Sequence, residues 1–390
     1  MRAEVIACLE RLESLSESWA ELVAEMDRPD LYDTWEWVIS CLTRFHGKAA
    51  EPFVIAVFDG DRCVGIAPLH RVNERHGGMI VRTLQWITYG LAMYGGFCLH
   101  GGRNEAEVLG KMADALVACR DEWDLLKLAN VNSSRNATFL VRKLLADRFS
   151  LYAEEADYVP YLNLVKDYPG KINGKERKDI ERRERNLLRE RRVRIELDRP
   201  FSADVWERAL ELHLAKWPDS LLHDPRYRGF CRQLYEDLSD RGQLGMSYLE
   251  IDGRIEAVNV CHFMNRKVYG KLTAYSPEYA RYGLGLILLN RLLCHYRDKG
   301  MEEFDFEGGT QPFKFYWTDT VRKNFNYYVC NNNAKRTFLR LWCALVLKRS
   351  LAIRARKLAW RSRLRALRTR RVPIVSPKVA RVPAKPLRDG

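Results

Sequence analysis

Hydrophobic and polar residues follow two different periods along the chain, which predicts a mixture of helices and strands. Apolar residues recur every three or four positions in segments that we expect to be helical: 14–46 (two helices), 105–119, 134–147, 201–217 and 227–238. The second of these helices has the N-cap pair Asp33-Thr34 and ends at Gly47. Apolar runs on both sides of Asp59-Gly60 and Asp252-Gly253 predict two β-hairpins.

The two hairpins lie in similar surroundings, since each follows two predicted helices. The first reads Ala-Val-Phe-Asp-Gly-Asp-Arg-Cys-Val-Gly-Ile-Ala from Ala56, and the second reads Tyr-Leu-Glu-Ile-Asp-Gly-Arg-Ile-Glu-Ala-Val from Tyr248. This repeated order indicates a distant internal duplication. We therefore expect an α/β (α+β) fold with two tandem domains, 1–160 and 161–330, each a mixed central sheet flanked by helices. A highly charged helix at 171–194 is expected to connect them.

The charge is divided unevenly. The chain has a formal net charge of +14, yet residues 321–390 hold 20 Lys and Arg against one acid, Asp389. The rest of the chain therefore carries a net charge of about −5, which argues against broad nucleic-acid affinity of the body. The hydrophobic content of 47% excludes global disorder. No signal peptide or uninterrupted apolar run of about 18 residues is found, so we expect a cytoplasmic protein, soluble or peripheral on the membrane.

The cysteines and histidines do not form a metal-binding pattern. The ten cysteines are scattered without a C-x-x-C pair, and several lie in apolar runs. Cys261 and His262 are neighbours in a predicted strand, so their side chains point to opposite faces. We predict no metal site, and we interpret His262 and His213 as packed side chains rather than as bases.

A glycine-containing loop is the clearest candidate for a binding site. The strand that ends at Tyr275 runs into Ser276 and then to Tyr-Gly-Leu-Gly-Leu from Tyr282, which opens a long apolar helix ending at Gly300. A helix start of this kind offers free backbone N–H groups to an anion, and Gly283 and Gly285 let a pyrophosphate approach the main chain. The spacing is neither a dinucleotide-binding fingerprint nor a P-loop. Tight helix packing is the structural alternative.

Two acids follow on the next predicted strand. Phe304 and Phe306 share one face of it, and Asp305 and Glu307 share the other. If the strand is central and parallel to its neighbour, exposure to solvent does not explain both acids. A capping role or an ion pair with Lys314 is the structural alternative.

These features together resemble a known family. The segment from Leu210 to Trp217, the second hairpin, the Y-G-L-G-L loop and the D-F-x-x-G-x-x-x-F-K string ending at Lys314 are similar to the CelD-like or FemAB-like branch of the GNAT superfamily of N-acetyltransferases. The resemblance covers roughly residues 165–330. It implies a tandem GNAT fold whose second half binds acyl-CoA, and a role in polysaccharide or cell-envelope biosynthesis. The first half is expected to shape the acceptor cleft without binding CoA.

The resemblance also implies roles for individual residues. The cofactor, acetyl-CoA or another acyl-CoA, would contact Lys314 and the loop residues Tyr275, Arg281, Tyr282, Gly283, Leu284 and Gly285. The acceptor amine, or a hydroxyl, would attack the thioester directly. Glu307 or Asp305 would take its proton, and Tyr316 would protonate the leaving thiolate. This loop departs from the family pattern, because Ala280 stands where a basic or Gln residue is usual and Arg281 comes one place later.

The C-terminal segment is expected to form a cationic helix followed by a disordered end. Apolar and cationic residues interleave over 331–371, typical of an amphipathic helix, and residues 335–371 are expected to lie on an anionic membrane; 372–390 is expected to be disordered. RNA binding and packing on the body are the alternatives for this helix.

The acceptor would be a small molecule or a lipid-linked precursor. Two rivals to the acyl-CoA enzyme are a FemAB-like transferase using aminoacyl-tRNA and a non-catalytic binding module.

Overall fold

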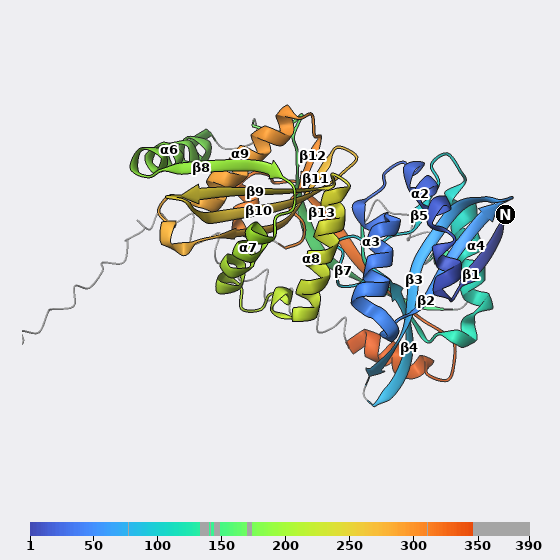
Figure 1. The fold of residues 1–390 in the computed structure, drawn as a ribbon. Coiled ribbons are helices and arrows are strands. Elements are labelled where there is room, and N and C mark those ends of the chain that lie inside the picture. Colours follow the sequence, from blue (N-terminus) through green and yellow to red (C-terminus); the bar gives the residue numbers. More distant parts are fainter. Residues whose placement is uncertain are drawn as a thin grey trace, which may run out of the picture. The chain divides into compact units, whose positions relative to one another are not determined.

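The described strands pair into a 13-stranded sheet that passes through both halves of the chain (Figure 1). Twelve of them follow the order β1-β2-β3-β4-β6-β13-β7-β12-β11-β10-β9-β8, and β5 pairs with β3 beside this path. The computed structural model describes residues 1–76, 78–132, 140, 142–143, 149–169, 174–309 and 311–345. Residues 1–341 form one compact unit and 342–390 a second, whose described residues 342–345 are helical. The helix predicted at 134–147 and the tail beyond residue 345 lie mostly or wholly outside the described residues.

The first half contains two helices, a hairpin and a crossover helix, as the sequence predicts. Its elements are β1 (Arg2–Ile6), α1 (Leu9–Glu13), α2 (Ser16–Ala24), η1 (Leu31–Asp33), α3 (Trp35–Ser40), η2 (Cys41–His46), η3 (Gly47–Ala49), β2 (Glu51–Asp59), β3 (Arg62–His76), β4 (Met79–Trp86), β5 (Cys98–Leu99), α4 (Glu105–Ala118), η4 (Arg120–Glu122), β6 (Leu125–Asn132) and β7 (Ser150–Asn163). Thr34 caps α3 by accepting a hydrogen bond from the Trp37 N–H, so the predicted helix start is confirmed.

The second half repeats this order. Its elements are α6 (Gly174–Glu190), β8 (Val193–Arg199), α7 (Ala203–Lys216), η5 (Leu221–His223), α8 (Pro225–Asp240), β9 (Leu244–Ile251), β10 (Arg254–Met264), β11 (Lys267–Tyr275), η6 (Pro277–Tyr279), α9 (Leu284–Asp298), β12 (Glu303–Asp305), η7 (Pro312–Tyr316) and β13 (Val321–Cys330). In each half, a hairpin leads to a further strand, a crossover helix and a parallel partner: β4 pairs in parallel with β6, and β11 with β12. The duplicated order is therefore present in the fold.

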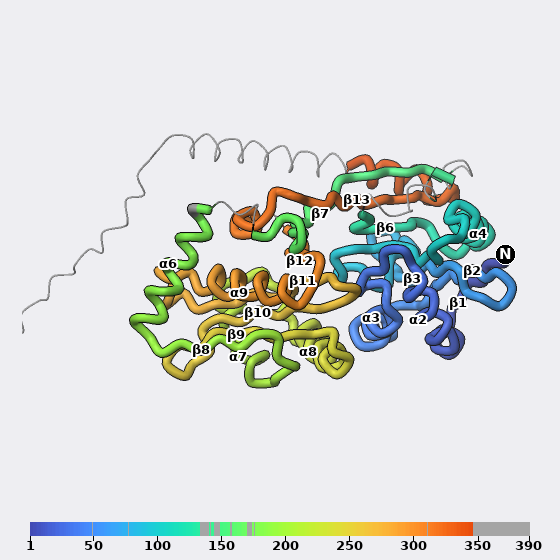
Figure 2. The backbone as a smooth tube through the Cα atoms, turned by 90° about the horizontal axis from the view of Figure 1, so that it is seen from above, coloured from blue at the N-terminus to red at the C-terminus, as the bar shows by residue number. Residues whose placement is uncertain are grey.

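Two strands join the halves. β7 pairs with β13 through Ser150–Pro160 and with β12 through Tyr161–Asn163, so the boundary expected between residues 160 and 161 falls inside one strand. β13 lies between β6 and β7, and so extends the sheet of the first half although it comes last in the chain (Figure 2). The strands of the two halves are hydrogen-bonded into one structure.

Helices cover both faces of the sheet in the second half. α7 and α8 pack on one face, in a core that contains Val258 and Val260 of β10, and α9 packs on the other with Ala257 and Cys261 (Figure 1). The alternation of these four residues along β10 places them on opposite faces. Among the described residues, no helix combines the length and apolar character needed to span a bilayer.

Candidate active site

The candidate site lies where two parallel strands separate. β11 and β12 pair only over Lys267–Tyr269 and Glu303–Asp305, and β11 then continues to Tyr275 while β12 ends. β10 remains paired with the other edge of β11 along this stretch. The separation leaves backbone N–H and C=O groups of β11 facing a gap, where an extended ligand can pair with them.

A β-bulge marks the point of separation. Cys261 pairs with Gly270 and Val260 with Leu272, so Lys271 is an extra residue in β11 with no partner in β10. Bulges of this kind bend a strand and re-aim a side chain. Here the bulge coincides with the end of the β11–β12 pairing.

A cavity of about 640 Å³ occupies the gap. Its lining comes from β11, the start of α9, the segment after β12, the end of α7, and Met93 of the first half. The residues are Met93, His213, Lys216, Trp217, Asn259, Gly270, Lys271, Leu272, Thr273, Tyr275, Ser276, Ala280, Gly283, Leu284, Gly285, Leu286, Leu289, Phe304, Phe306, Glu307, Gly308, Gln311, Pro312, Phe313 and Lys314. The structure thus brings together six of the predicted site residues: Tyr275, Gly283, Leu284, Gly285, Glu307 and Lys314.

The main chain at the start of α9 is accessible to close approach by other groups, because it contains two glycines. Gly283 is its N-cap residue, with φ +69°, a left-handed conformation that glycine adopts without strain. A Cβ atom at Gly285 would lie 2.8 Å from the Tyr275 ring. The first turn carries no acid and no side chain caps it. By contrast, α4 of the first half has Glu105 and Glu107 in its first turn and is capped by Asn104.

Glu307 lines the cavity and is only 8% exposed. Its carboxylate accepts hydrogen bonds from the Tyr32 hydroxyl and from the Lys271 ammonium, whose Nζ lies 2.9 Å from both oxygens. Its backbone has φ +54°, a conformation that is uncommon and strained for a residue with a side chain. Strain held in place beside a cavity points to a functional role for Glu307.

Asp305 is fully buried in an ionic cluster and does not line the cavity. Its oxygens lie 2.6 Å from the Tyr94 hydroxyl, 3.1 Å from Lys267 Nζ and 3.4 Å from Arg322 Nη1. Lys267 also pairs with Asp30, which comes from the first half. β12 is central and parallel to β11, so the condition set on the argument from its two acids is met. Asp305 connects the halves through Tyr94.

Lys314 is buried and points toward the chain that carries Glu307. Its Nζ donates to the backbone carbonyls of Glu307 (3.1 Å) and Gly308 (2.6 Å). These bonds hold the strained turn after β12 in place. Lys314 is also among the residues that line the cavity.

Arg281, Tyr282 and Tyr316 are not among the residues that line the cavity. Arg281 forms an ion pair with Glu190 of α6 (2.9 Å), and the Tyr282 hydroxyl donates to the same carboxylate (2.6 Å). Tyr316 is 39% exposed at the end of η7, the helix that brings Phe313 and Lys314 to the cavity.

Lys216 and His213 also line the cavity, and both belong to the segment from Leu210 to Trp217 on which the family resemblance partly rests. Lys216 lies 3.6 Å from the centroid of the Tyr275 ring and donates to its hydroxyl, next to the start of α9. His213 lines the cavity and contacts Ser220 Oγ at 3.0 Å, and burial lowers its pKa, so the ring is neutral at pH 7. His262 is fully buried between the rings of Trp37 and Tyr235, which confirms its interpretation as a packed residue. The described residues hold no cluster of metal-binding side chains.

Comparison with known proteins agrees with this geometry. Residues 174–315 match the model of a family described as "Acetyltransferase (GNAT) domain". No curated protein sequence matches the chain. A crystal structure titled FemX is similar in fold, with 13% identity and a TM-score of 0.62, and covers 86% of this chain and 99% of that one. Residues 174–315 therefore form a GNAT domain, which makes the chain an acyltransferase.

Two further structures are similar to this chain in fold. L-PGS from Bacillus licheniformis has 16% identity and a TM-score of 0.52, covering 88% of this chain and 96% of that one. The C-terminal domain of a putative lysylphosphatidylglycerol synthetase from Agrobacterium fabrum has 12% identity and a TM-score of 0.50, covering 86% and 97%. The fold is thus similar to that of FemX and of these two proteins, with two tandem GNAT-like halves.

Proposed function

We propose that the protein is an N-acyltransferase that uses acetyl-CoA or another acyl-CoA. The amine acceptor would be a sugar, a lipid-linked precursor or another envelope precursor. One observation carries this proposal: a single cavity joins the uncapped, acid-free start of α9 to the unpaired edge of β11 and to the Glu307 carboxylate. The cofactor's phosphates, its extended pantetheine arm and the reacting thioester each have a complementary group along that path.

The difference between α9 and α4 supports binding in the second half alone. A pyrophosphate is stabilised by free N–H groups at a helix start and repelled by carboxylates placed there. Glu105 and Glu107 occupy the start of α4, and the Asn104 side chain already accepts the Glu107 N–H. We therefore assign acyl-CoA to α9 and the shaping of the acceptor cleft to the first half.

The chemistry is direct transfer. The protonated acceptor amine gives one proton to the Glu307 carboxylate, and the neutral amine attacks the thioester carbonyl carbon. The N–C bond forms as the C–S bond breaks, the thiolate takes the second amine proton, and the first proton passes from Glu307 to water. N–H groups on the free edge of β11 and the Lys314 ammonium stabilise the carbonyl oxygen as it gains charge. Thiolate protonation by Tyr316, and phosphate contacts of Arg281 and Tyr282, stay predictions.

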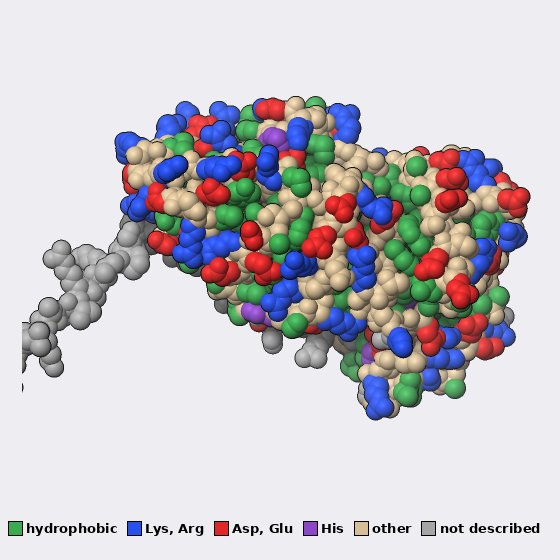
Figure 3. All heavy atoms as spheres, viewed as in Figure 1, with side chains coloured by type: hydrophobic (Ala, Val, Ile, Leu, Met, Phe, Trp, Pro, Cys, Tyr) green, Lys and Arg blue, Asp and Glu red, His purple; other side chains and the backbone are tan. Residues whose placement is uncertain are grey.

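Aminoacyl transfer from tRNA is the second candidate, because the fold similarity to FemX and to a lysylphosphatidylglycerol synthetase extends over more than four fifths of the chain. The charge of α6 argues against a role for it in binding RNA. Arg177 pairs with Glu181, and Arg182 and Arg183 both pair with Asp179. Acidic and basic side chains are also interspersed over the face shown in Figure 3. Much of the positive charge on α6 is therefore balanced by acidic side chains next to it.

Ligand-dependent thermal stability separates the two candidates. A ligand that binds only the folded chain raises its unfolding midpoint, by an amount that grows with concentration over Kd. We expect acetyl-CoA or a longer acyl-CoA to raise the midpoint and tRNA to leave it unchanged. A rise with tRNA and none with any acyl-CoA would reverse the order of the candidates.

We also propose that the cationic segment 335–371 brings the enzyme to an anionic membrane, where a lipid-linked acceptor is found. Its charge and interleaved apolar residues support this. The test compares the full-length chain with a full-length variant in which the Lys and Arg residues of 348–371 are replaced by Gln. We expect the unmodified chain alone to sediment with phosphatidylglycerol vesicles. Equal sedimentation of both chains would contradict the proposal.

A further inference from the structure

We propose that the first half completes the active site through Tyr32, which acts with Lys271 to position the Glu307 carboxylate. This inference rests on the proposed acyl transfer. Tyr32 belongs to η1, far from Glu307 in the sequence, and its hydroxyl donates directly to Glu307 Oε1. The carboxylate that faces the cavity is therefore oriented by a residue outside the GNAT domain match at 174–315.

The surroundings of Tyr32 fix its position. It is 2% exposed, and its ring packs edge-on against Trp37 with centroids 4.9 Å apart and against Tyr269 at 5.9 Å. Asp30 and Asp33 close a capping box around its short helix, and Thr34 caps α3 directly after it. The hydroxyl therefore has little freedom to turn away from Glu307.

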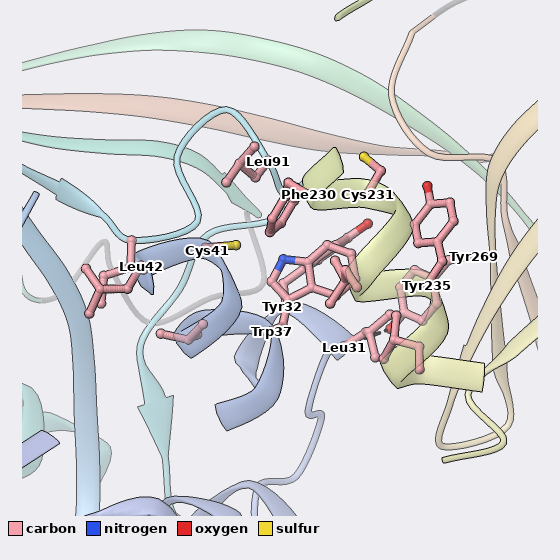
Figure 4. Close-up of a cluster of buried hydrophobic side chains, with 14 of the residues drawn as sticks. Leu31, Tyr32, Trp37, Cys41, Leu42, Leu91, Phe230, Cys231, Tyr235 and Tyr269 are labelled. Carbon is pink, nitrogen blue, oxygen red and sulfur yellow. Dashed lines mark hydrogen bonds between the residues drawn. The ribbon is translucent and has the colours of Figure 1, made fainter. Parts of the chain in front are cut away.

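The core around Tyr32 belongs to both halves. Figure 4 shows Tyr32 and Trp37 of the first half facing Cys231 and Tyr235 of α8, and all four residues belong to one hydrophobic cluster. This packing holds η1 against the second half, so the Tyr32–Glu307 contact does not depend on the hydrogen bond alone.

Lys271 approaches the same carboxylate from β11. Its Nζ lies 2.9 Å from both Glu307 oxygens and 3.2 Å from the Tyr32 hydroxyl, above the rings of Tyr32 and Trp37. The bulge that ends the β11–β12 pairing gives Lys271 this direction. Two donors thus fix both oxygens of a carboxylate that lines the cavity.

Tyr32 acts as a donor and not as a base. Burial, followed by the nearby Glu307 charge, raises the pKa of Tyr32 well above its usual range. The phenol therefore keeps its proton at any pH at which the enzyme works. Its part is to orient the Glu307 oxygens for the acceptor amine, which makes Tyr32 a positioning residue.

The fold supplies a matched control for this contact. Tyr94, also from the first half and also buried, donates to Asp305 at 2.6 Å, two residues before Glu307. Asp305 does not line the cavity. Tyr32→Phe and Tyr94→Phe therefore each remove one buried hydroxyl between the halves, and only the first removes a hydrogen bond to a residue that lines the cavity.

The experiment measures thiol release from acetyl-CoA by the full-length protein, with water and with glucosamine as acceptor probes. For Tyr32→Phe we expect kcat to fall about tenfold with KM for acetyl-CoA within about twofold, and Tyr94→Phe to keep the kcat of the unmodified enzyme. A purely structural role would lower the thermal midpoint without this difference between the effects on kcat and on KM.

The thermal unfolding midpoints of the two variants then separate a loss of stability from a loss of catalysis. Equal losses of midpoint in both variants, with loss of kcat only in Tyr32→Phe, support the inference. Equal kcat for the two variants overturns it. If Tyr32→Phe fails to fold, Lys271→Met is measured in its place, with the same expected fall in kcat at an unchanged KM for acetyl-CoA. An unmodified enzyme that neither binds acetyl-CoA nor releases its thiol would instead refute the proposed function, and this inference with it.

Discussion

The backbone of Gly285 packs directly against the ring of Tyr275, and a Cβ atom added there would lie 2.8 Å from the ring. Heavy atoms do not approach so closely without displacement. We predict that Gly285→Ala pushes Tyr275 into the cavity and weakens acetyl-CoA binding at least about tenfold, measured by calorimetry, a loss of about 1.4 kcal/mol.

Gly229→Ala is the control for this change. Gly229 is also a helical glycine, on α8, and a Cβ there meets no atom within 4 Å. It should bind acetyl-CoA normally and be more stable by up to about 1 kcal/mol, because alanine favours the helix. Equal affinities for the two variants would show that the start of α9 does not bind the cofactor.

A charge placed at Gly283 tests the phosphate site directly. Gly283 has φ +69°, a conformation that Asn and Asp tolerate better than other side chains. Gly283→Asp and Gly283→Asn have nearly the same shape and differ by one negative charge. We predict that the Asp variant binds acetyl-CoA at least about tenfold more weakly than the Asn variant at low salt.

The same pair at Gly242 shows what the backbone alone contributes. Gly242 has φ +68°, and a Cβ there meets nothing within 4 Å. Asp and Asn at position 242 should bind acetyl-CoA equally well. If the Asp variant at position 283 also binds as well as its Asn partner, no phosphate lies near this turn.

His70 should make the stability of the first half dependent on pH. It is fully buried beside Gln85, and burial, with a smaller contribution from His46, lowers its pKa to about 3. The unfolded chain binds this proton near pH 6.5, so stability is full above that value and is lost as the pH falls toward 3. We expect about 1.5 kcal/mol to be lost between pH 6.5 and pH 5, measured by urea unfolding.

The comparison variant is His70→Gln, which keeps a polar group opposite Gln85 but does not titrate. Its free energy of unfolding should change less than that of the unmodified chain over the same interval. If the free energies of unfolding of the two chains change equally with pH, His70 is not the group that makes stability depend on pH.

Asp124 should be among the most sensitive positions for stability. Its fully buried carboxylate lies 2.9 Å from Arg82 Nη2 and 2.7 Å from Lys335 Nζ. Burial would raise the pKa of Asp124, but the bonds from Arg82 and Lys335 outweigh it and hold the pKa well below its usual range. Its stabilisation is thus present above about pH 4 and lost as the pH falls below it.

We predict that Asp124→Asn lowers the free energy of unfolding by about 3 kcal/mol at pH 7, because two cations lose their shared anion. Asp121→Asn, an exposed neighbour, should change it by less than about 0.5 kcal/mol. Similar losses in both variants would show that Asp124 is not a specific anchor.

Local patterns predicted most of the elements but not the partners of the last strand. Both Asp-Gly turns, the N-cap at Thr34 and the long helix after Gly283 are local signals, and all are present. Residues 321–330 are predicted to belong to the second domain, and nothing in their composition shows that β13 pairs with β6 and β7, well over a hundred residues earlier. Long-range pairing of this kind has no local signature.

The site was predictable where it rests on a motif and not where it rests on contact between the halves. The glycine turn, Glu307 and Lys314 were found from the string between Gly283 and Lys314. Tyr32 lies in a three-residue helix without a pattern of its own. Lys271 did leave a trace, a charged residue that interrupts the apolar run of a central strand, and a bulge is one reason for such an interruption.

The position of β13 sets an order for biosynthesis. The strand that lies between β6 and β7 is the last one made, so the first half cannot complete its sheet until residue 330 has left the ribosome. Domains that consist of one continuous segment can fold as they emerge. In this chain, the first half must wait for the second, and the late, distant pairing favours slow folding of the two halves together.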